Sequence, residues 1–297
     1  MRKVLLATTA LVAMSVTAAQ ADVSISGGMD FQYTTSDSAD DAASVDGNIT
    51  IKGSMITDTG LTVTVTQNNA LQVQSLNTAA TMRDSQVEDA FMTVAGDFGT
   101  LILGQTDMVN DRNDGALGIN NDVFSLEPVT HGTLIGTDTS DSTAANIGFE
   151  SPTMNGLKVY AGAVPAGGSQ LGANFSIAGL SMHVQTATGF AAGQDEVSIG
   201  AKGSFAGATI AVGSKQEDAS GTKTDSSDFA IKYPMTDTTT VSFLYEEGST
   251  GTTKHEKTSI EAKYTITPGL DFYIGTSSID TAGTTDSGAA AALSVSF

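Results

Sequence analysis

Acidic side chains crowd one segment of the chain, residues 107–143, where they could attract or hold cations. The segment has one arginine and one histidine against seven carboxylates: Asp107, Asp111, Asp114, Asp122, Glu127, Asp138 and Asp141, with Arg112 and His131. Carboxylate oxygens suit Ca²⁺, but the D-x-D-x-D-G spacing of a calcium loop is missing. We therefore expect no defined metal site and no resident cofactor, and Ca²⁺ on the acidic loops remains open.

The three histidines invite a catalytic interpretation. His131, His183 and His255 are far apart in the sequence, and the chain has no Gly-x-Ser-x-Gly elbow, no H-E-x-x-H motif and no cysteine. Serine and aspartate are so abundant that their presence carries little information about a hydrolytic triad. We expect no catalytic residues, and an enzyme is the least favoured class.

The first 21 residues have the pattern of a cleaved export signal. Arg2 and Lys3 precede an apolar run, and Ala19-Gln20-Ala21 has the small-x-small pattern of a cleavage site. The run is shorter than the ~20 residues that span a bilayer. We predict a signal peptide over residues 1–21, with cleavage between Ala21 and Asp22, and a second unit over residues 22–297.

The chain is strongly acidic. Its formal charge is −20, and removal of the signal takes two basic residues and no acidic one, which gives −22. Such a charge disfavours nucleic acid and anionic lipid as partners, so no nucleic acid is expected, and it favours cations as counterions or as passing solutes. Mean hydropathy is near zero, at +0.01. Alternating membrane strands and a soluble β protein would both give that value.

After residue 21 the sequence is a train of short segments with period-2 alternation. In the first, Val23, Ile25 and Phe31 lie on one face while Ser24, Asp30 and Gln32 lie on the other. Sixteen such strands are predicted, over residues 23–34, 47–57, 61–69, 86–95, 99–106, 144–151, 157–164, 170–178, 180–188, 196–205, 208–215, 227–233, 240–247, 258–266, 270–278 and 289–297.

Connections between these segments alternate between tight and long. Tight turns carry Gly, Pro and Asp, as at Asp58-Thr59-Gly60 and Thr267-Pro268-Gly269. Long loops are predicted over residues 35–46, 70–85, 107–143, 165–169, 189–195, 216–226, 248–257 and 279–288. This order places all long loops at one end of an all-β, closed, antiparallel up-and-down barrel with short periplasmic turns and long external loops.

Sixteen strands enclose an interior too wide for side chains to fill. The apolar faces should therefore point outward to lipid, and the polar faces inward. The predicted pore wall includes Lys52, Glu150, Lys158, Lys202, Lys232, Glu261 and Lys263, and His183, Asp228, Glu246 and Asp271 share that face. Outward aromatics gather near the strand ends, which is typical of membrane girdles. The Ala289–Ala292 stretch fits either a subunit contact or a plain lipid-facing strand.

Several segments together resemble the sixteen-stranded general porins of alphaproteobacteria. The likeness is carried by residues 22–27, 96–105, 149–157 and 293–297. The resemblance implies an outer-membrane homotrimer, a water-filled pore in each subunit and a third loop folded into it as a constriction. It also implies that the terminal Phe297 is an assembly signal for the barrel assembly machinery. In this chain the third loop is 107–143, and the family's basic wall would have to consist of lysines.

The expected function is therefore passive diffusion of ions and small hydrophilic solutes across the outer membrane, with a preference for cations. Segment 107–143 would then line the pore as an electrostatic filter, although a solvated external loop is the alternative. A soluble or surface-attached β-rich adhesin or structural protein is the second class, and a barrel hydrolase the third. No fixed internal period supports a solenoid.

Overall fold

The computed structural model describes residues 21–37, 40–70, 86–107, 109–113, 145–165, 167–190 and 194–297. Within them the chain forms sixteen strands and one short 3₁₀ helix, η1 (Asp111–Asn113). The strands are β1 (Asp22–Ser36), β2 (Ala42–Ile56), β3 (Thr62–Ala70), β4 (Gln86–Gly96), β5 (Gly99–Gln105), β6 (Asn146–Glu150), β7 (Leu157–Ala163), β8 (Ser169–Ile177), β9 (Leu180–Phe190), β10 (Gln194–Phe205), β11 (Ala208–Ala219), β12 (Thr222–Pro234), β13 (Thr239–Thr250), β14 (Thr253–Thr267), β15 (Leu270–Thr281) and β16 (Thr284–Ser296).

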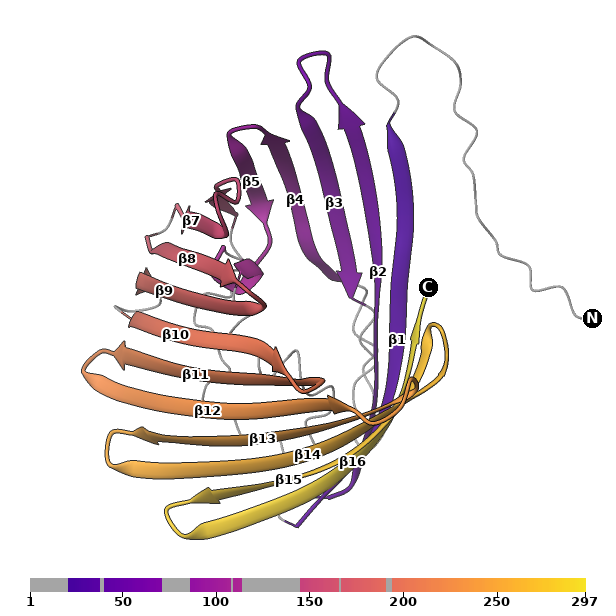
Figure 1. Ribbon diagram of the computed structural model, residues 1–297, viewed down its shortest axis with the longest axis vertical. Helices are drawn as coiled ribbons and strands as arrows, with labels where there is room; N and C mark the ends of the chain where they lie inside the picture. The colour runs from indigo at the N-terminus through magenta and orange to yellow at the C-terminus, as the bar shows by residue number, and fades with distance from the viewer. Residues whose placement is uncertain are drawn as a thin grey trace, which may run out of the picture.

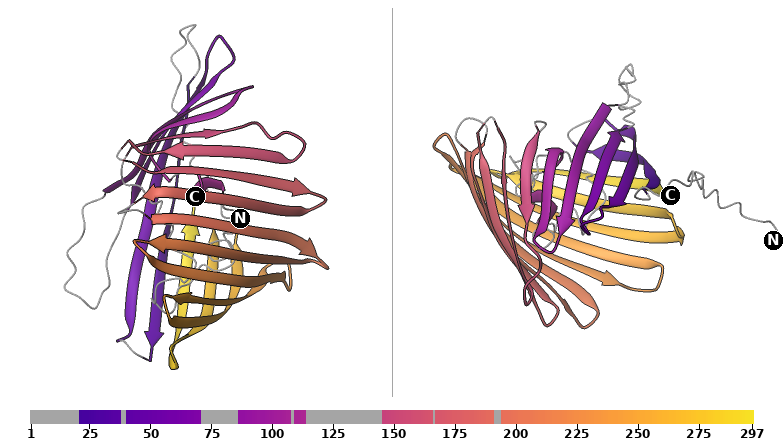
Figure 2. Two further views of the ribbon diagram at one scale, coloured as in Figure 1. Left: turned by 90° about the vertical axis from the view of Figure 1, so that its left-hand side faces the viewer. Right: turned by 90° about the horizontal axis from the view of Figure 1, so that it is seen from above.

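Every described strand pairs antiparallel with its neighbours in sequence, and β1 pairs with β16 to close the ring (Figure 1). At the seam the Gly27 amide donates to the Phe297 carbonyl oxygen at 3.1 Å, and the Phe297 amide donates back to the Gly27 carbonyl at 3.0 Å. The two ends of the described barrel therefore meet, and no strand edge is left open. The expected closed up-and-down barrel is confirmed, and all sixteen predicted segments are present as strands. Figure 2 shows the strands from two further sides.

Three of the predicted long loops are wrong, and a fourth, 35–46, is shortened because β1 runs to Ser36 and β2 begins at Ala42. Strands β11 to β16 continue through residues 216–226, 248–257 and 279–288, so their connections shrink to Ser220-Gly221, Gly251-Thr252 and Ala282-Gly283. These stretches are rich in Ser and Thr, and their polar side chains gave no alternating signal. A polar segment still pairs as a strand when its neighbour extends alongside it. A strand needs only ~10 residues to cross the hydrocarbon core of the membrane, so the additional residues of β11 to β16 project beyond it.

Two of these three two-residue hairpins share the same backbone conformation. Ser220 (φ 54°) and Gly221 (φ 89°) both lie at positive φ, and Ala282 (φ 53°) with Gly283 (φ 87°) repeat the pattern. Positive φ at both central residues characterises the type I′ turn, whose twist matches that of the strands it joins. Glycine follows in second place because a side chain is disfavoured at such angles.

Side chains alternate between the two faces as the sequence predicts. On β10, Val197 and Ile199 are 52% and 59% exposed, while the intervening Ser198 is 1% exposed. In a closed barrel the buried face is the inner one, so apolar side chains cover the outside and polar ones line the inside. Outward aromatics near the turn-side ends include Phe205, Tyr233 and Tyr264, each at least 47% exposed. This distribution matches an apolar belt with aromatic borders.

The Ala-rich stretch in β16 divides between the faces. Ala290 and Ala292 are buried inside and pack with Tyr273, whereas Ala289 and Ala291 face outward. Within the described residues, no helix is long and apolar enough to cross a membrane.

Candidate functional site

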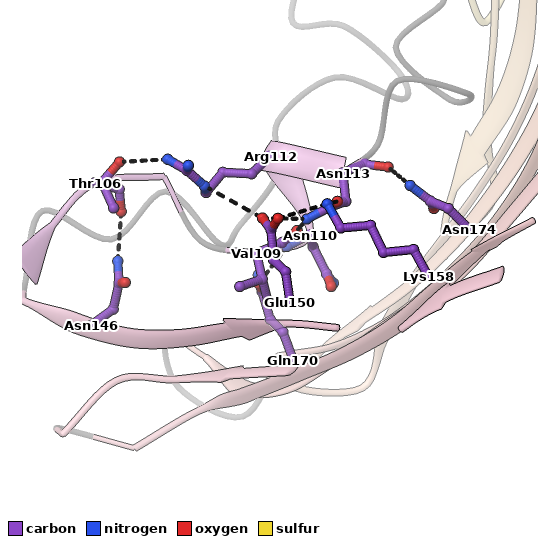
Figure 3. A network of polar contacts seen from close by, with 10 residues as sticks. All are labelled: Thr106, Val109, Asn110, Arg112, Asn113, Asn146, Glu150, Lys158, Gln170 and Asn174. Carbon is purple, nitrogen blue, oxygen red and sulfur yellow. Dashed lines mark hydrogen bonds and ion pairs between the residues drawn. The ribbon is translucent and has the colours of Figure 1, made fainter. Parts of the chain in front are cut away.

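A short stretch after β5, residues 109–113, lies against the inner wall of the barrel (Figure 3). Val109 is 1% exposed and packs with Ile102 of β5 and Tyr160 of β7. We name residues 109–113 the docked segment. It belongs to the predicted third loop, in which Asp107 is also described, and it lies against the inner faces of β6 to β9.

Glycines on the wall make room for this packing. A Cβ at Gly148 would come within 2.6 Å of Val109 Cγ1, so only glycine admits the valine there. At Gly172 a Cβ would lie 2.2 Å from the Tyr160 ring. Tyr160 therefore lies across β8 and presents a flat apolar side to the segment. The wall at β6 to β8 is shaped to receive the docked segment.

Asn110 is buried and ties the docked segment to two strands. Its backbone amide donates to Gln170 Oε1 on β8 at 3.0 Å, and its side-chain Nδ2 donates to the Thr186 carbonyl on β9 at 3.3 Å. At the base of the segment, Asn146 Nδ2 donates to the Thr106 carbonyl at 2.5 Å. These bonds satisfy polar groups that burial would otherwise leave without partners.

Asn113 is the hub of a charged network. Its Nδ2 donates to the Val109 carbonyl at 2.8 Å and to Glu150 Oε1 at 3.0 Å, and its carbonyl accepts from Asn174 Nδ2 at 2.8 Å. Lys158 Nζ donates to Asn113 Oδ1 at 2.7 Å and to Glu150 Oε2 at 2.6 Å. Hydrogen bonds with an ionised partner are short and strong, so this network locks the segment to the wall.

Arg112 joins the network from the docked segment. Its Nε lies 3.7 Å from Glu150 Oε1, and its guanidinium lies 5.2 Å from the Phe91 ring centroid. Arg112 of the docked segment and Lys158 of the wall therefore converge on Glu150 of the wall. The resemblance implies a loop of acids facing a wall of bases, whereas here a loop base and a wall base share one wall acid.

Most of the acids predicted to form the constriction cannot be placed. Asp114, Asp122, Glu127, Asp138 and Asp141 lie outside the described residues, as does His131. Asp107 is exposed, and Asp111 belongs to η1. Among the side chains that are described, no group of three His, Asp or Glu residues is arranged to hold a metal ion.

All seven predicted pore-wall residues lie on the inward-facing register positions. Glu150 and Lys158 contact one another in the network above, and Lys263 Nζ forms a 2.9 Å bridge to Asp271 Oδ2. Glu261 is buried, Lys52 is exposed, and Lys202 and Lys232 are half-buried. Of the seven, Glu150 and Lys158 contact the docked segment. Phe297, the predicted assembly signal, faces outward at the seam and is 73% exposed.

Sequence reasoning missed the uncharged part of the site. Val109, Asn110, Asn113, Asn174 and Gln170 gave no signal as a set, because the contacts join positions up to 76 residues apart. The inward phase of Gln170, Asn174 and Gln185 on β8 and β9 was the available clue, since amides on a lumen face need partners.

A family comparison decides what kind of barrel this is. The profile of the Gram-negative porin family matches residues 7–284. The chain belongs to this family. It is an outer-membrane porin of a Gram-negative bacterium, and the expected family and outer-membrane location are confirmed. A search of curated protein sequences found no match.

Solved structures share the porin fold at low sequence identity. The anion-selective porin from Comamonas acidovorans has 12% identity and a TM-score of 0.76, over 94% of this chain and 100% of that one. The trimer form of OmpT from Vibrio cholerae has 12% identity and a TM-score of 0.74, over 93% and 99%. A triple mutant of the Rhodopseudomonas blastica porin has 16% identity and a TM-score of 0.73, over 93% and 100%. At these identities the likeness concerns the fold.

Proposed function

We propose that this porin is a passive channel for ions and small hydrophilic solutes and that it prefers cations. The charge on its inner wall is the observation that carries the preference. On the described strands, inward-facing carboxylates outnumber inward-facing lysines by twelve to seven. The carboxylates are Asp22, Asp30, Asp46, Asp89, Glu150, Glu196, Glu217, Asp228, Glu246, Glu261, Asp271 and Asp286, and the lysines are Lys52, Lys158, Lys202, Lys215, Lys232, Lys257 and Lys263.

Fixed charge on the wall of a water-filled pore concentrates the opposite ion within it. An excess of carboxylates therefore raises the concentration of cations in the lumen. The Comamonas porin is described as anion-selective, so the shared fold leaves the sign of selectivity to the side chains of each chain. Diffusion through such a pore needs no catalytic residue and no resident cofactor. Ca²⁺ is proposed only as a counterion on acidic loops.

The test is a reversal potential in planar bilayers. Purified protein should give stepwise conductance increments, and a tenfold KCl gradient should give a zero-current potential of the sign that marks K⁺ as the more permeant ion. Equal permeability or anion selectivity would contradict the preference without touching the channel itself. The absence of conductance steps would contradict the channel. Hydrolysis of ester or peptide reporters by the purified protein would instead support the barrel-hydrolase alternative.

We propose that the mature chain begins at Asp22 and assembles as a homotrimer in outer-membrane lipid, with Phe297 read by the barrel assembly machinery. Strand β1 begins at the predicted mature N-terminus, and OmpT from Vibrio cholerae is described in a trimer form. Intact-mass measurement of the outer-membrane protein tests the cleavage. Migration on unheated and heated detergent gels tests the trimer, and loss of assembly in Phe297→Ser tests the terminal signal.

A further inference from the structure

Inward-facing lysines gather at one mouth of the barrel. Lys52, Lys158, Lys202, Lys232 and Lys263 belong to five different strands, and each lies within four residues of the turn-side end of its strand. Three inward carboxylates share this zone: Asp22, Glu150 and Asp271. We name these eight residues the turn-side zone. Its formal charge is +2.

The inner wall has the opposite charge toward the loop side. Inward charged residues that lie six or more residues from the turn-side end of their strands form the loop-side zone. It holds nine carboxylates, Asp30, Asp46, Asp89, Glu196, Glu217, Asp228, Glu246, Glu261 and Asp286, against Lys215 and Lys257. Among the described strand residues this zone has a formal charge of −7.

Ion pairing within a zone leaves this separation intact. Lys158 pairs with Glu150 at 2.6 Å and Lys263 with Asp271 at 2.9 Å, both inside the turn-side zone. Lys215 pairs with Glu196 at 3.0 Å inside the loop-side zone. Each pair cancels one charge of each sign in its own zone, so the net charges are unchanged.

The loop-side zone also places like charges on adjacent strands. Asp30 of β1 lies directly opposite Asp46 of β2, and Asp228 of β12 lies opposite Glu246 of β13. Like charges facing each other across a strand pair are unfavourable. Lys257 of β14 lies opposite Glu246 on its other side and balances part of this repulsion, and mobile cations would relieve the rest.

We infer that the lumen is bipolar along its axis and that the pore therefore conducts asymmetrically. The inference rests on the proposed channel function. Cations concentrate at the loop-side zone and anions at the turn-side zone, because each attracts its counterion. A positive potential on the loop side drives both ions toward the border of the zones, where they accumulate. The opposite polarity draws both ions away from it and lowers the conductance.

The test is the current–voltage curve of single channels at two salt concentrations. In 0.1 M KCl, where the Debye length is about 10 Å, we expect currents at opposite polarities to differ by roughly 1.5-fold or more. In 1 M KCl the Debye length falls to about 3 Å, and the curve should become nearly symmetric. Biotin on Thr252→Cys, in an exposed loop-side turn of a chain without cysteine, lets streptavidin in one chamber mark the side that the loops face.

The decisive variant combines Lys52→Gln, Lys202→Gln and Lys232→Gln, which makes the turn-side zone negative. The ratio of the currents at opposite polarities in 0.1 M KCl should then fall toward one, and cation selectivity should increase. Lys223→Gln with Lys254→Gln is the matched control, because these lysines face outward at the register positions next to Asp218 and Ser249. That control should leave the curve unchanged.

Two failures are distinguishable. A protein that gives conductance steps with a symmetric curve in 0.1 M KCl overturns the bipolar lumen but leaves the channel standing. A protein without conductance steps overturns the channel. If the triple variant does not fold, the salt dependence of the unaltered protein still decides the inference, because wall charges act only over the Debye length.

Discussion

Strands β5 to β8 and strands β11 to β16 line the same barrel but are held in place by different contacts. The first group is short, with five to nine residues per strand, and it is braced from inside by the docked segment. The second group has twelve to fifteen residues per strand, and two-residue turns close each loop-side end. A wall of long hairpins is stabilised by its own register, whereas a short-stranded wall relies on a segment packed against it.

This comparison predicts that damage to the long-stranded wall reduces stability, while damage near the docked segment alters the current through the pore. Stability is measured as the free energy of unfolding by urea in detergent, followed by far-ultraviolet circular dichroism because the chain has no tryptophan. Current is measured by single-channel recording.

Lys215→Met should have the largest effect on stability. Lys215 and Glu196 are 6% and 2% exposed, and their 3.0 Å bridge joins β11 to β10. Removing one partner of a buried pair costs about 3–5 kcal/mol. The double variant Lys215→Met with Glu196→Leu should recover most of that loss. Equal losses in the single and double variants would show that the bridge does not stabilise this wall.

Gly148→Val should disturb the short-stranded wall. The new side chain occupies the space of Val109 Cγ1, so the docked segment must leave its position. Overpacking of this kind costs about 1–3 kcal/mol. The released segment should add noise to the open-channel current. Gly53→Val is the control, since its Cβ meets nothing within 4 Å on the outer face of β2. Identical noise in both variants would argue against docking.

Asn113→Ala should give a milder version of the same result. It removes the side chain that bonds the Val109 carbonyl, Glu150 and Lys158. We expect the free energy of unfolding to fall by about 1–3 kcal/mol, because hydrogen bonds to buried and charged groups are broken. The open-channel current should also become noisier. Gln67→Ala, which removes an exposed amide from the outer face of β3, is the comparison for a general loss of an amide. If Asn113→Ala adds no noise to the open-channel current, the Asn113 side chain does not hold the docked segment in place.

Ala282→Gly should sharpen the comparison from the opposite direction by stabilising a hairpin. Ala282 has a positive φ of 53°, which costs an L-residue roughly 1 kcal/mol that glycine avoids. Greater chain entropy in the unfolded state offsets part of this gain. We expect the free energy of unfolding to rise by a few tenths of a kcal/mol and the single-channel current to stay unchanged. A clear decrease in the urea midpoint would show that the turn tolerates alanine without strain.

Alternation in the sequence was sufficient to predict the strands and the direction that each strand faces. The period of two is local, and the apolar–polar contrast along residues such as Val197, Ser198 and Ile199 is visible in any single strand. The same contrast disappears in the Ser- and Thr-rich ends of β11 to β16. There the length of a strand depends on whether its neighbour extends alongside it, and a local pattern carries no information about a neighbour.

The sequence by itself determined a closed barrel with an apolar outside and a charged inside, because both follow from side-chain type and spacing along each strand. Only the tertiary structure decided that Val109 lies over Gly148, that Arg112 and Lys158 meet at Glu150, and that five lysines share one mouth. Those arrangements depend on the register between strands and on closure of the ring. Both bring together residues that are far apart in the chain.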